Sequence, residues 1–221
     1  MTRYYLSIHL LSDATFGRGD GTAGLVDTEI EHDQYGLPFV GGRVIKGLLV
    51  EEYANLRFAL GGDGAWDAVA TVLFGQIGAA ADKTAQMRVG TATLPSDLCA
   101  WLRTEQLPPT KVLDACTGIR RQTALNAETG GPEEKSLRAM RVLLRETVLL
   151  APLDFTLPAP PDQRTLGLLA ACVLAVRRGG TARNRGRGRL RMLLHEQEPV
   201  HDYPSAFTEQ CFQHFAREVP Q

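Results

Sequence analysis

The chain has 221 residues, of which 44% are hydrophobic and 22% are charged, and its formal net charge is −1. This length and apolar content suit one sizeable core, so we expect a single domain over residues 1–221. No apolar run is long enough to cross a membrane and the N-terminus lacks a signal-peptide pattern, which predicts a cytoplasmic protein with no membrane partner. Widely spaced cysteines favour free thiols over a zinc site: Cys99, Cys116, Cys172 and Cys211.

The N-terminal half is predicted to contain strands, a glycine-rich loop and a long helix. Alternating apolar residues indicate a strand over Tyr4–Leu11, and the following stretch, Ser12–Leu25, is a loop by its glycine content. A short extended piece at Val26–Asp33 precedes a helix over Arg43–Leu60. Two further elements are expected, a helix over Trp66–Phe74 and a strand over Gln86–Leu94.

The C-terminal half is predicted to begin with a polar insertion at about residues 108–140, which contains the turn Asn126–Pro132. The elements expected after it are a long strand over Arg141–Leu157, a helix over Thr165–Arg178, a strand over Arg189–Leu194 and a helix over Pro204–Arg217. The order β-α-β…β-α-β is typical of an α+β fold with a ferredoxin-like, RRM-type antiparallel sheet.

The segment GGTARNRGRGRLR, Gly179–Arg191, concentrates five arginines and four glycines in thirteen residues. Glycine lets the main chain approach an anion closely, and arginine offers a fork of donors that matches phosphate oxygens. The segment therefore indicates a nucleic-acid backbone contact. The alternative is a solvated or disordered basic tail, but a predicted helix and a predicted strand flank the segment and embed it in the fold. A Walker-type nucleotide loop is excluded, because no GxxxxGK precedes a Ser or Thr.

Further cations lie where they could extend this contact. The first turn of the long helix carries two of them, and the exposed N–H groups of a helix start attract anions. The glycine-rich loop near the N-terminus and the polar insertion carry others. The residues expected to contact RNA are Arg18, Arg43, Lys46, Arg120, Arg121, Arg183, Arg185, Gly186, Arg187 and Gly188.

Four segments in this order resemble the RAMP superfamily, specifically the backbone subunit of Csm-type and Cmr-type complexes, the type III CRISPR effectors of antiviral defence. They are VDTEIEHDQYGLPFVGGRVIKG at Val26–Gly47, LFG at Leu73–Gly75, TGIRRQTALNAETGGPEEKSLRAMRVL at Thr117–Leu143 and GGTARNRGRGRL at Gly179–Leu190. The resemblance implies a thumb-like insertion and a glycine-rich loop. Its partners would be guide RNA (crRNA), target RNA, further copies of the chain and other subunits of the complex.

The resemblance also implies an endoribonuclease activity that cuts target RNA and leaves a 2′,3′-cyclic phosphate. Asp27 falls at the position of the family's catalytic aspartate, so it is the expected catalytic residue and the ligand of a Mg²⁺ or Mn²⁺ ion. The alternative for Asp27 is an ordinary loop carboxylate that stabilises a turn, and Asp33 fits that alternative better. His32 could act as a base, but a lone histidine beside acids is more often a surface residue.

The chain departs from the family pattern at some positions. Arg43-Val44 replaces a pair of serines, Arg120 replaces an acidic residue, and Arg187 replaces an aromatic one, so base stacking from residue 187 is not expected. Three other functions stay open: a non-cleaving RNA-binding scaffold of the same complex, a repeat-processing RAMP endoribonuclease that acts through histidine, and an unrelated RRM-like RNA-binding protein. The last lacks support, because no RNP-like aromatic pair occurs on the predicted strands.

Overall fold

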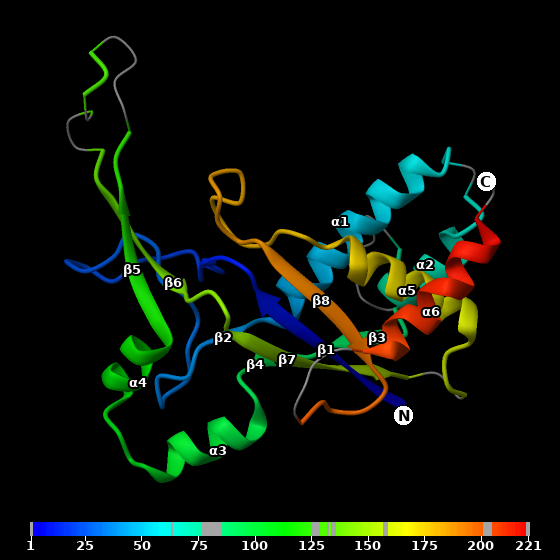
Figure 1. Ribbon diagram of the computed structural model, residues 1–221, viewed down its shortest axis with the longest axis horizontal. Helices are drawn as coiled ribbons and strands as arrows, with labels where there is room; N and C mark the ends of the chain where they lie inside the picture. The colour runs from blue at the N-terminus through cyan, green and yellow to red at the C-terminus, as the bar shows by residue number, and fades with distance from the viewer. Residues whose placement is uncertain are drawn as a thin grey trace.

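The computed structural model describes residues 2–62, 64–76, 85–124, 129–131, 133, 136–156, 159–200 and 205–219. In this part of the chain, a six-stranded sheet, a separate two-stranded sheet and six helices form an α+β fold (Figure 1). The predicted α+β class is therefore confirmed. None of the described helices is long and apolar enough to cross a membrane.

The main sheet has the strand order β2-β4-β7-β1-β8, and β3 also pairs with β7. Every strand pair in it is antiparallel. Its strands are β1 (Thr2–Leu10), β2 (Phe39–Val40), β3 (Met87–Val89), β4 (Ala92–Thr93), β7 (Val148–Phe155) and β8 (Leu190–His195). The central strand β1 keeps the predicted alternation, since Tyr4, Leu6, Ile8 and Leu10 are all buried in the core.

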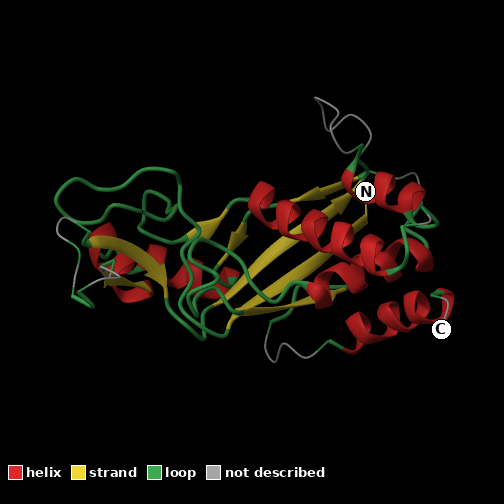
Figure 2. Ribbon diagram, turned by 90° about the horizontal axis from the view of Figure 1, so that it is seen from above, coloured by secondary structure: helices red, strands yellow, loops and turns green. Residues whose placement is uncertain are grey.

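Helices lie over one side of the sheet (Figure 2). The six helices of the described residues are α1 (Gly42–Ala59), α2 (Asp67–Phe74), α3 (Ser96–Thr104), α4 (Pro109–Cys116), α5 (Gln163–Ala175) and α6 (Ala206–Glu218). Helix α5 is buried at every position from Thr165 to Val173, because it packs against α1, α2, α6 and the sheet. Asp162 caps it by accepting a hydrogen bond from the Thr165 N–H at 2.7 Å. Tyr4 of β1 stacks on Phe207 of α6, which fixes the even-numbered face of β1 as the helix-covered face.

The two-stranded sheet is a hairpin of β5 (Thr117–Gln122) and β6 (Arg138–Leu143), which extends away from the main sheet (Figure 1). The prediction of one strand over Arg141–Leu157 is wrong, because β6 and β7 belong to different sheets. The chain turns between them at the exposed pair Arg145-Glu146, and Glu146 adopts a φ of 69°. Apolar and polar residues alternate on both sides of this turn, so the pattern in the sequence predicted one continuous strand where the structure has two.

Helices α3 and α4 were not predicted from the sequence. Both follow a proline at the N-cap, Pro95 and Pro108, and α4 has a second proline at its first position, which is a favourable helix start. The predicted insertion at 108–140 therefore begins with a helix rather than with polar loop. The strand predicted at Gln86–Leu94 is divided into β3 and β4 at Gly90, whose backbone packs against Pro152. Within the predicted turn Asn126–Pro132, both named end residues lie outside the described residues.

Candidate nucleic-acid interface

A groove of about 500 Å³ lies where three segments distant in sequence meet. Residues 27–28 form one wall, the open end of the β5–β6 hairpin forms the second, and residues 180–185 of the glycine-rich segment form the third. The groove thus brings together three of the regions from which the sequence predicted functional residues. Asp27, Arg183 and Arg185 are the predicted site residues that line it.

Asp27 is exposed and is held by the hairpin. Its N–H donates to the Ala139 carbonyl oxygen at 2.8 Å, and the Ala139 N–H donates to Asp27 Oδ2 at 2.6 Å. The next residue, Thr28, forms a parallel bridge with Met140 and accepts a hydrogen bond from the Arg141 N–H at 3.0 Å. Residues 27–29 therefore lie beside β6, joined to it by an isolated bridge, where the sequence predicted a short extended piece.

The glycine-rich segment is tied to the body of the protein through its backbone. The Thr181 N–H donates to Thr15 O at 2.8 Å, and the Gly188 N–H donates to Asp13 O at 2.9 Å. Gly180 and Gly188 both have positive φ, and a Cβ at either would collide with a main-chain carbonyl group. Glycine is therefore needed at position 180 for the loop to sit against Thr15, and at position 188 for the two ends of the loop to approach each other at Gly179. Gly186 also has a positive φ, of 78°, at the turn of the loop.

The arginines of this loop are engaged to different degrees. Arg183 forms a two-pronged ion pair with Glu51 of α1, with both N–O distances at 2.9 Å, and this pairing lowers the pKa of the Glu51 carboxyl. Arg187 lies against Met140 Sδ of the hairpin. Among the described residues, neither Arg185 nor Arg138 of β6 is found in an ion pair. Arg138 was missed in the sequence, although it begins the strand that returns from the arginine-containing insertion.

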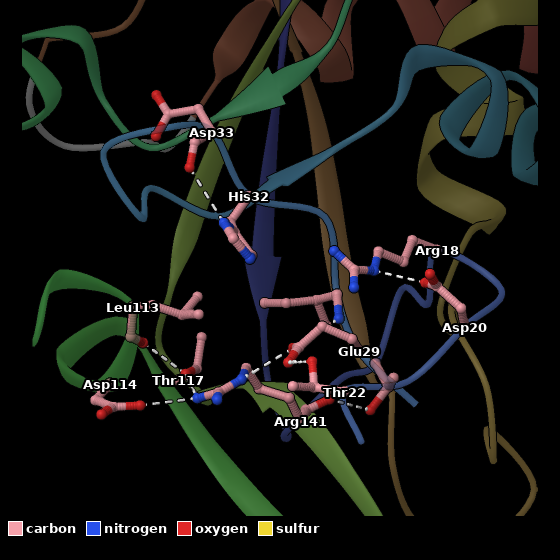
Figure 3. Close-up of polar contacts among 12 residues, drawn as sticks. Arg18, Asp20, Thr22, Glu29, His32, Asp33, Leu113, Asp114, Thr117 and Arg141 are labelled. Atoms are coloured by element: carbon pink, nitrogen blue, oxygen red, sulfur yellow. Dashed lines mark hydrogen bonds and ion pairs between the residues drawn. The ribbon is translucent and has the colours of Figure 1, made fainter. Parts of the chain in front are cut away.

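The other predicted cations lie outside this groove. Arg18 pairs with Asp20 at 2.6 Å, as Figure 3 shows. Arg120 pairs with Asp13 at 2.7 Å, and Arg121 is exposed on β5. The helix-start cations Arg43 and Lys46 line a second hollow of about 520 Å³, together with Arg88 of β3.

Two residues that follow Asp27 by five and six positions, His32 and Asp33, lie at the start of a turn. Asp33 Oδ1 accepts hydrogen bonds from the N–H groups of Tyr35 and Leu37, at 2.9 and 3.0 Å. His32 Nδ1 lies 3.1 Å from the Asp33 carbonyl oxygen (Figure 3). Asp33 is thus the turn-forming carboxylate that its sequence suggested.

A buried charged cluster beneath the hairpin was not predicted. Arg141 Nε lies 2.9 Å from Glu29 Oε1, and Arg141 Nη1 lies 2.9 Å from Asp114 Oδ1 and 3.0 Å from Thr117 Oγ1. Figure 3 shows the guanidinium between these groups. Glu29 and Arg141 are 112 positions apart, and each looks like an ordinary surface charge in the sequence. No local signal announces this pair.

The carboxylates near the groove are few. Among the described residues that line the groove, Asp27 alone is acidic. One of its oxygens already accepts a hydrogen bond from the Ala139 N–H. Across the described parts of the chain, no three His, Cys, Asp or Glu side chains gather as a metal site. A divalent cation normally takes six or more oxygen ligands. These residues therefore do not form a complete cation site by themselves.

The described fold and groove define an α+β protein with a helix-covered antiparallel sheet and a projecting hairpin. No protein-family model matches the sequence, and no curated protein matches it. The fold is similar to a chain in the cryo-EM structure of type III-B Cmr-beta in its apo state, with a TM-score of 0.63, 11% identity and coverage of 87% of this chain and 97% of that one. It is also similar to a chain of type III-B Cmr-beta bound to cognate target RNA, with a TM-score of 0.62, 11% identity and coverage of 88% and 97%. At this identity the likeness establishes a shared fold.

Proposed function

We propose that this chain is a guide-RNA-binding backbone subunit of a type III CRISPR effector complex that cuts the target RNA bound to it. The groove carries the proposal, because it places one carboxylate, Asp27, opposite arginines from the hairpin and the glycine-rich loop. The similarity to chains of type III-B Cmr-beta, one of them bound to cognate target RNA, supports the same assignment. The proposed partners are crRNA, target RNA, other copies of the chain and the remaining subunits.

The finer fold assignment belongs to this proposal. A ferredoxin-like, RRM-type sheet is supported by the antiparallel order β8-β1-β7-β3, with α1 between β1 and β3 and α5 between β7 and β8. The β5–β6 hairpin, which extends beyond the sheet, is the proposed thumb. The hydrogen-bonded segment from Gly179 to Arg189 is the proposed glycine-rich RNA-binding loop.

The chemistry requires little from the protein, since RNA carries its own nucleophile. In the proposed reaction, Asp27 accepts the proton of the 2′-hydroxyl, directly or through one water, while the 2′-oxygen attacks the adjacent phosphorus. The P–O5′ bond breaks, water donates a proton to the departing 5′-oxygen, and the products are a 2′,3′-cyclic phosphate and a 5′-hydroxyl. Arg138 and Arg185 would offset the negative charge that develops on the phosphoryl oxygens.

The hairpin gives this reaction its geometry. In A-form RNA the 2′-oxygen is not in line with the leaving oxygen, so one phosphate must leave helical geometry before attack is possible. A hairpin that projects beside the groove could separate the strands at that point and flip a base. Repeated copies of the chain would then cut the target at even intervals.

The expected Mg²⁺ or Mn²⁺ requirement remains a separate proposal. Since Asp27 alone does not complete a cation site, phosphate oxygens of the RNA would have to supply most of the ligands. The proton transfer above does not depend on such an ion. Assays in Mg²⁺, in Mn²⁺ and in EDTA will measure the requirement directly.

The substitution Asp27→Asn tests the proposed cutting activity. Asparagine keeps an oxygen that can accept the Ala139 N–H, so the groove keeps its shape while the charge is removed. We expect guide loading and target affinity to survive and cleavage to fall by about a hundredfold or more. The measurement is the rate of cleavage of a labelled target by the assembled complex.

The matched control is Asp33→Asn, which keeps the oxygen that accepts from Tyr35 and Leu37. It should cut nearly as well as the parent. Cleavage at the parental rate by Asp27→Asn would exclude Asp27 as the catalytic residue.

A non-cleaving scaffold is the second candidate. One observation favours it: Asp27 Oδ2 is already bonded to the hairpin backbone, as in a carboxylate that only fastens a loop. A parent complex that binds target RNA and never cuts it, with or without divalent metal, would establish the scaffold. The repeat-processing alternative has less support, because no histidine lies among the described residues that line the groove.

A further inference from the structure

We propose that Arg141 is a positioning residue, which fixes the register between residues 27–29 and strand β6 and thereby places Asp27 in the groove. The effect on cutting rests on the function proposed above, whereas the fixed register does not. The inference starts from the short pairing between residues 27–29 and the hairpin. That pairing consists of a few main-chain hydrogen bonds around the Thr28–Met140 bridge.

A pairing this short does not define its own register. In a strand, successive side chains point to opposite faces, so a slip by one residue would turn the Asp27 carboxylate to the other face of the hairpin. Residues 20–25 before it are mostly exposed loop. Main-chain bonds from Glu29 to Asp20 and from Arg18 to Glu29 tie the segment to that loop, not to the hairpin. A side-chain contact to β6 would therefore add a direct link that selects one register against the hairpin.

The Arg141 side chain makes that contact. Its own N–H bonds to Thr28 O at 3.0 Å, and its guanidinium reaches Glu29, the next residue along the paired segment, at 2.9 Å. Glu29 is fixed in turn, because its carboxylate accepts hydrogen bonds from the Ile30 N–H at 3.0 Å and from Thr22 Oγ1 at 3.2 Å. The main chain and the side chain of Arg141 thus both favour the same register between residues 27–29 and β6.

The same guanidinium reaches two further segments. Arg141 Nη1 lies 2.9 Å from Asp114 of α4 and 3.0 Å from Thr117 at the start of β5 (Figure 3). Arginine suits this junction because its planar fork presents several donors in fixed directions, whereas a lysine ammonium is a single point of charge. The segment that carries Asp27, the hairpin and helix α4 are therefore joined through one side chain.

The burial of this cluster argues for placement rather than for stability. Arg141 is 4% exposed and Glu29 is 2% exposed. The Arg141 Nε–H is close to Glu29 but is not aligned with it or with another acceptor in the described structure. A buried ion pair with imperfect hydrogen bonds commonly stabilises a protein no better than two apolar side chains do. What an apolar pair would not supply is a defined register.

The double variant Glu29→Met/Arg141→Met separates these two roles. Two methionines fill similar volume without charge, and Asp114 is exposed enough to remain solvated. We expect a urea midpoint near that of the parent, because removal of the buried charges offsets the loss of the acceptors for the Ile30 N–H and the Thr22 hydroxyl. RNA affinity should stay within about threefold, since neither residue lines the groove. The cleavage rate at saturating RNA should fall by about a hundredfold, because the catalytic group is misplaced. The control is Arg3→Met, which removes an arginine–aspartate pair on β1 away from the groove.

Hydrogen exchange supplies a readout that does not depend on cutting. In the double variant the N–H groups of Asp27 and Ala139 should exchange at least about tenfold faster than in the parent or in Arg3→Met, because their pairing is no longer held in one register. Should the double variant not fold, Glu29→Gln serves in its place. It keeps one oxygen, which can still accept from the Ile30 N–H, replaces the oxygen that accepts from Thr22 with an amide NH2, and removes the charge that faces Arg141.

The outcomes separate the two proposals. A stable double variant that cuts at the parental rate, with unchanged exchange, overturns the positioning role of Arg141. A parent that never cuts defeats the proposed activity, and the exchange rates then decide the positioning role alone. The double variant and Glu29→Gln could also both cut more slowly and lose stability, while the folded protein keeps the parental exchange rates. In that case Arg141 would be only a structural ion-pair residue, and the positioning role would be overturned.

Discussion

Two groups of buried polar side chains lie in different parts of this molecule, one made of uncharged groups and the other of an ion pair. On β1, Ser7 Oγ lies 2.8 Å from His195 Nε2 and 3.1 Å from His9 Nε2, on the face of the strand away from the helices. Burial lowers the pKa of both histidines, that of His9 to about 4, so this cluster is neutral at pH 7. At the base of the hairpin, Arg141 and Glu29 form a buried ion pair. The sheet therefore buries polar groups by keeping them neutral, and the groove side buries charges by pairing them.

The largest change in stability that we expect is a loss of unfolding free energy in acid, when the histidines of the neutral cluster gain protons. Desolvation, and then the nearby Arg191 and His195, hold the pKa of His9 below its unfolded value of 6.5. A histidine with a depressed folded pKa contributes its full stability above pH 6.5 and loses it as the pH falls toward 4. The free energy of unfolding should drop by a few kcal/mol, on the order of 3, across that window.

Urea unfolding at several pH values between 7 and 4 measures this loss, with His9→Gln as the comparison. The glutamine variant should be less sensitive to acid, because it cannot gain a proton. An identical pH slope in the parent and in His9→Gln would assign the loss to other groups.

The groove arginines should affect RNA binding and leave stability alone. We expect the double variant Arg138→Ala/Arg185→Ala to bind RNA about tenfold more weakly and to reduce the slope of log affinity against log salt by about 1.4, since each phosphate contact to a single strand contributes about 0.7. Its urea midpoint should match that of the parent.

The control for this pair is Arg3→Ala/Arg164→Ala, which removes two arginines paired with Asp154 and Glu218 away from the groove. Equal salt slopes in the two double variants would show that the groove does not contact phosphate.

The smallest expected effect concerns Arg183, whose guanidinium is already paired with Glu51 of the same chain. Glu51→Gln should release Arg183 and remove a negative charge near the groove, so RNA affinity should rise by about twofold to fivefold. Binding titrations at low salt detect this gain, and raising the salt should diminish it. The gain should be smaller in the background Arg183→Ala, where only the removal of the Glu51 charge acts. An equal gain there would show that Glu51 affects RNA binding without Arg183.

The elements with strong periodicity were predictable from the sequence. Strand β1 alternates because its two faces meet different surroundings, and α5 is apolar throughout because it is buried on all sides. The break between β6 and β7 was not predictable from alternation, which continues on both sides of Arg145-Glu146. The turn is marked in the structure by the φ of Glu146, the exposure of both residues and the bond from the Thr147 N–H to Leu144 O.

The site was predictable in its parts and not in its assembly. The glycine-rich segment could be singled out from residue type and Asp27 from the family resemblance, and the groove brings them together from positions more than 150 residues apart. The engagement of Arg183 with Glu51 and the burial of Arg141 depend on which helix and which strand lie nearby. The type of a residue does not indicate which residues will lie next to it in the fold. Arg183 and Arg141 therefore could not be told apart in the sequence, although one is partly exposed and the other is buried.

The way in which residue 27 is held has a consequence for how such a protein can change over generations. One bond that holds it, from the residue 27 N–H to Ala139 O, is made by the main chain, so nearly any amino acid at 27 could make it. The second goes from the Ala139 N–H to the Asp27 carboxylate, and an asparagine oxygen could accept it as well. The placement of residue 27 and the cutting chemistry of the proposed function are thus encoded largely by different residues, and the identity of residue 27 decides the chemistry. Under the proposed function, a lineage could silence or regain cutting by a single substitution at this position, while every surface that holds RNA or neighbouring subunits is inherited unchanged.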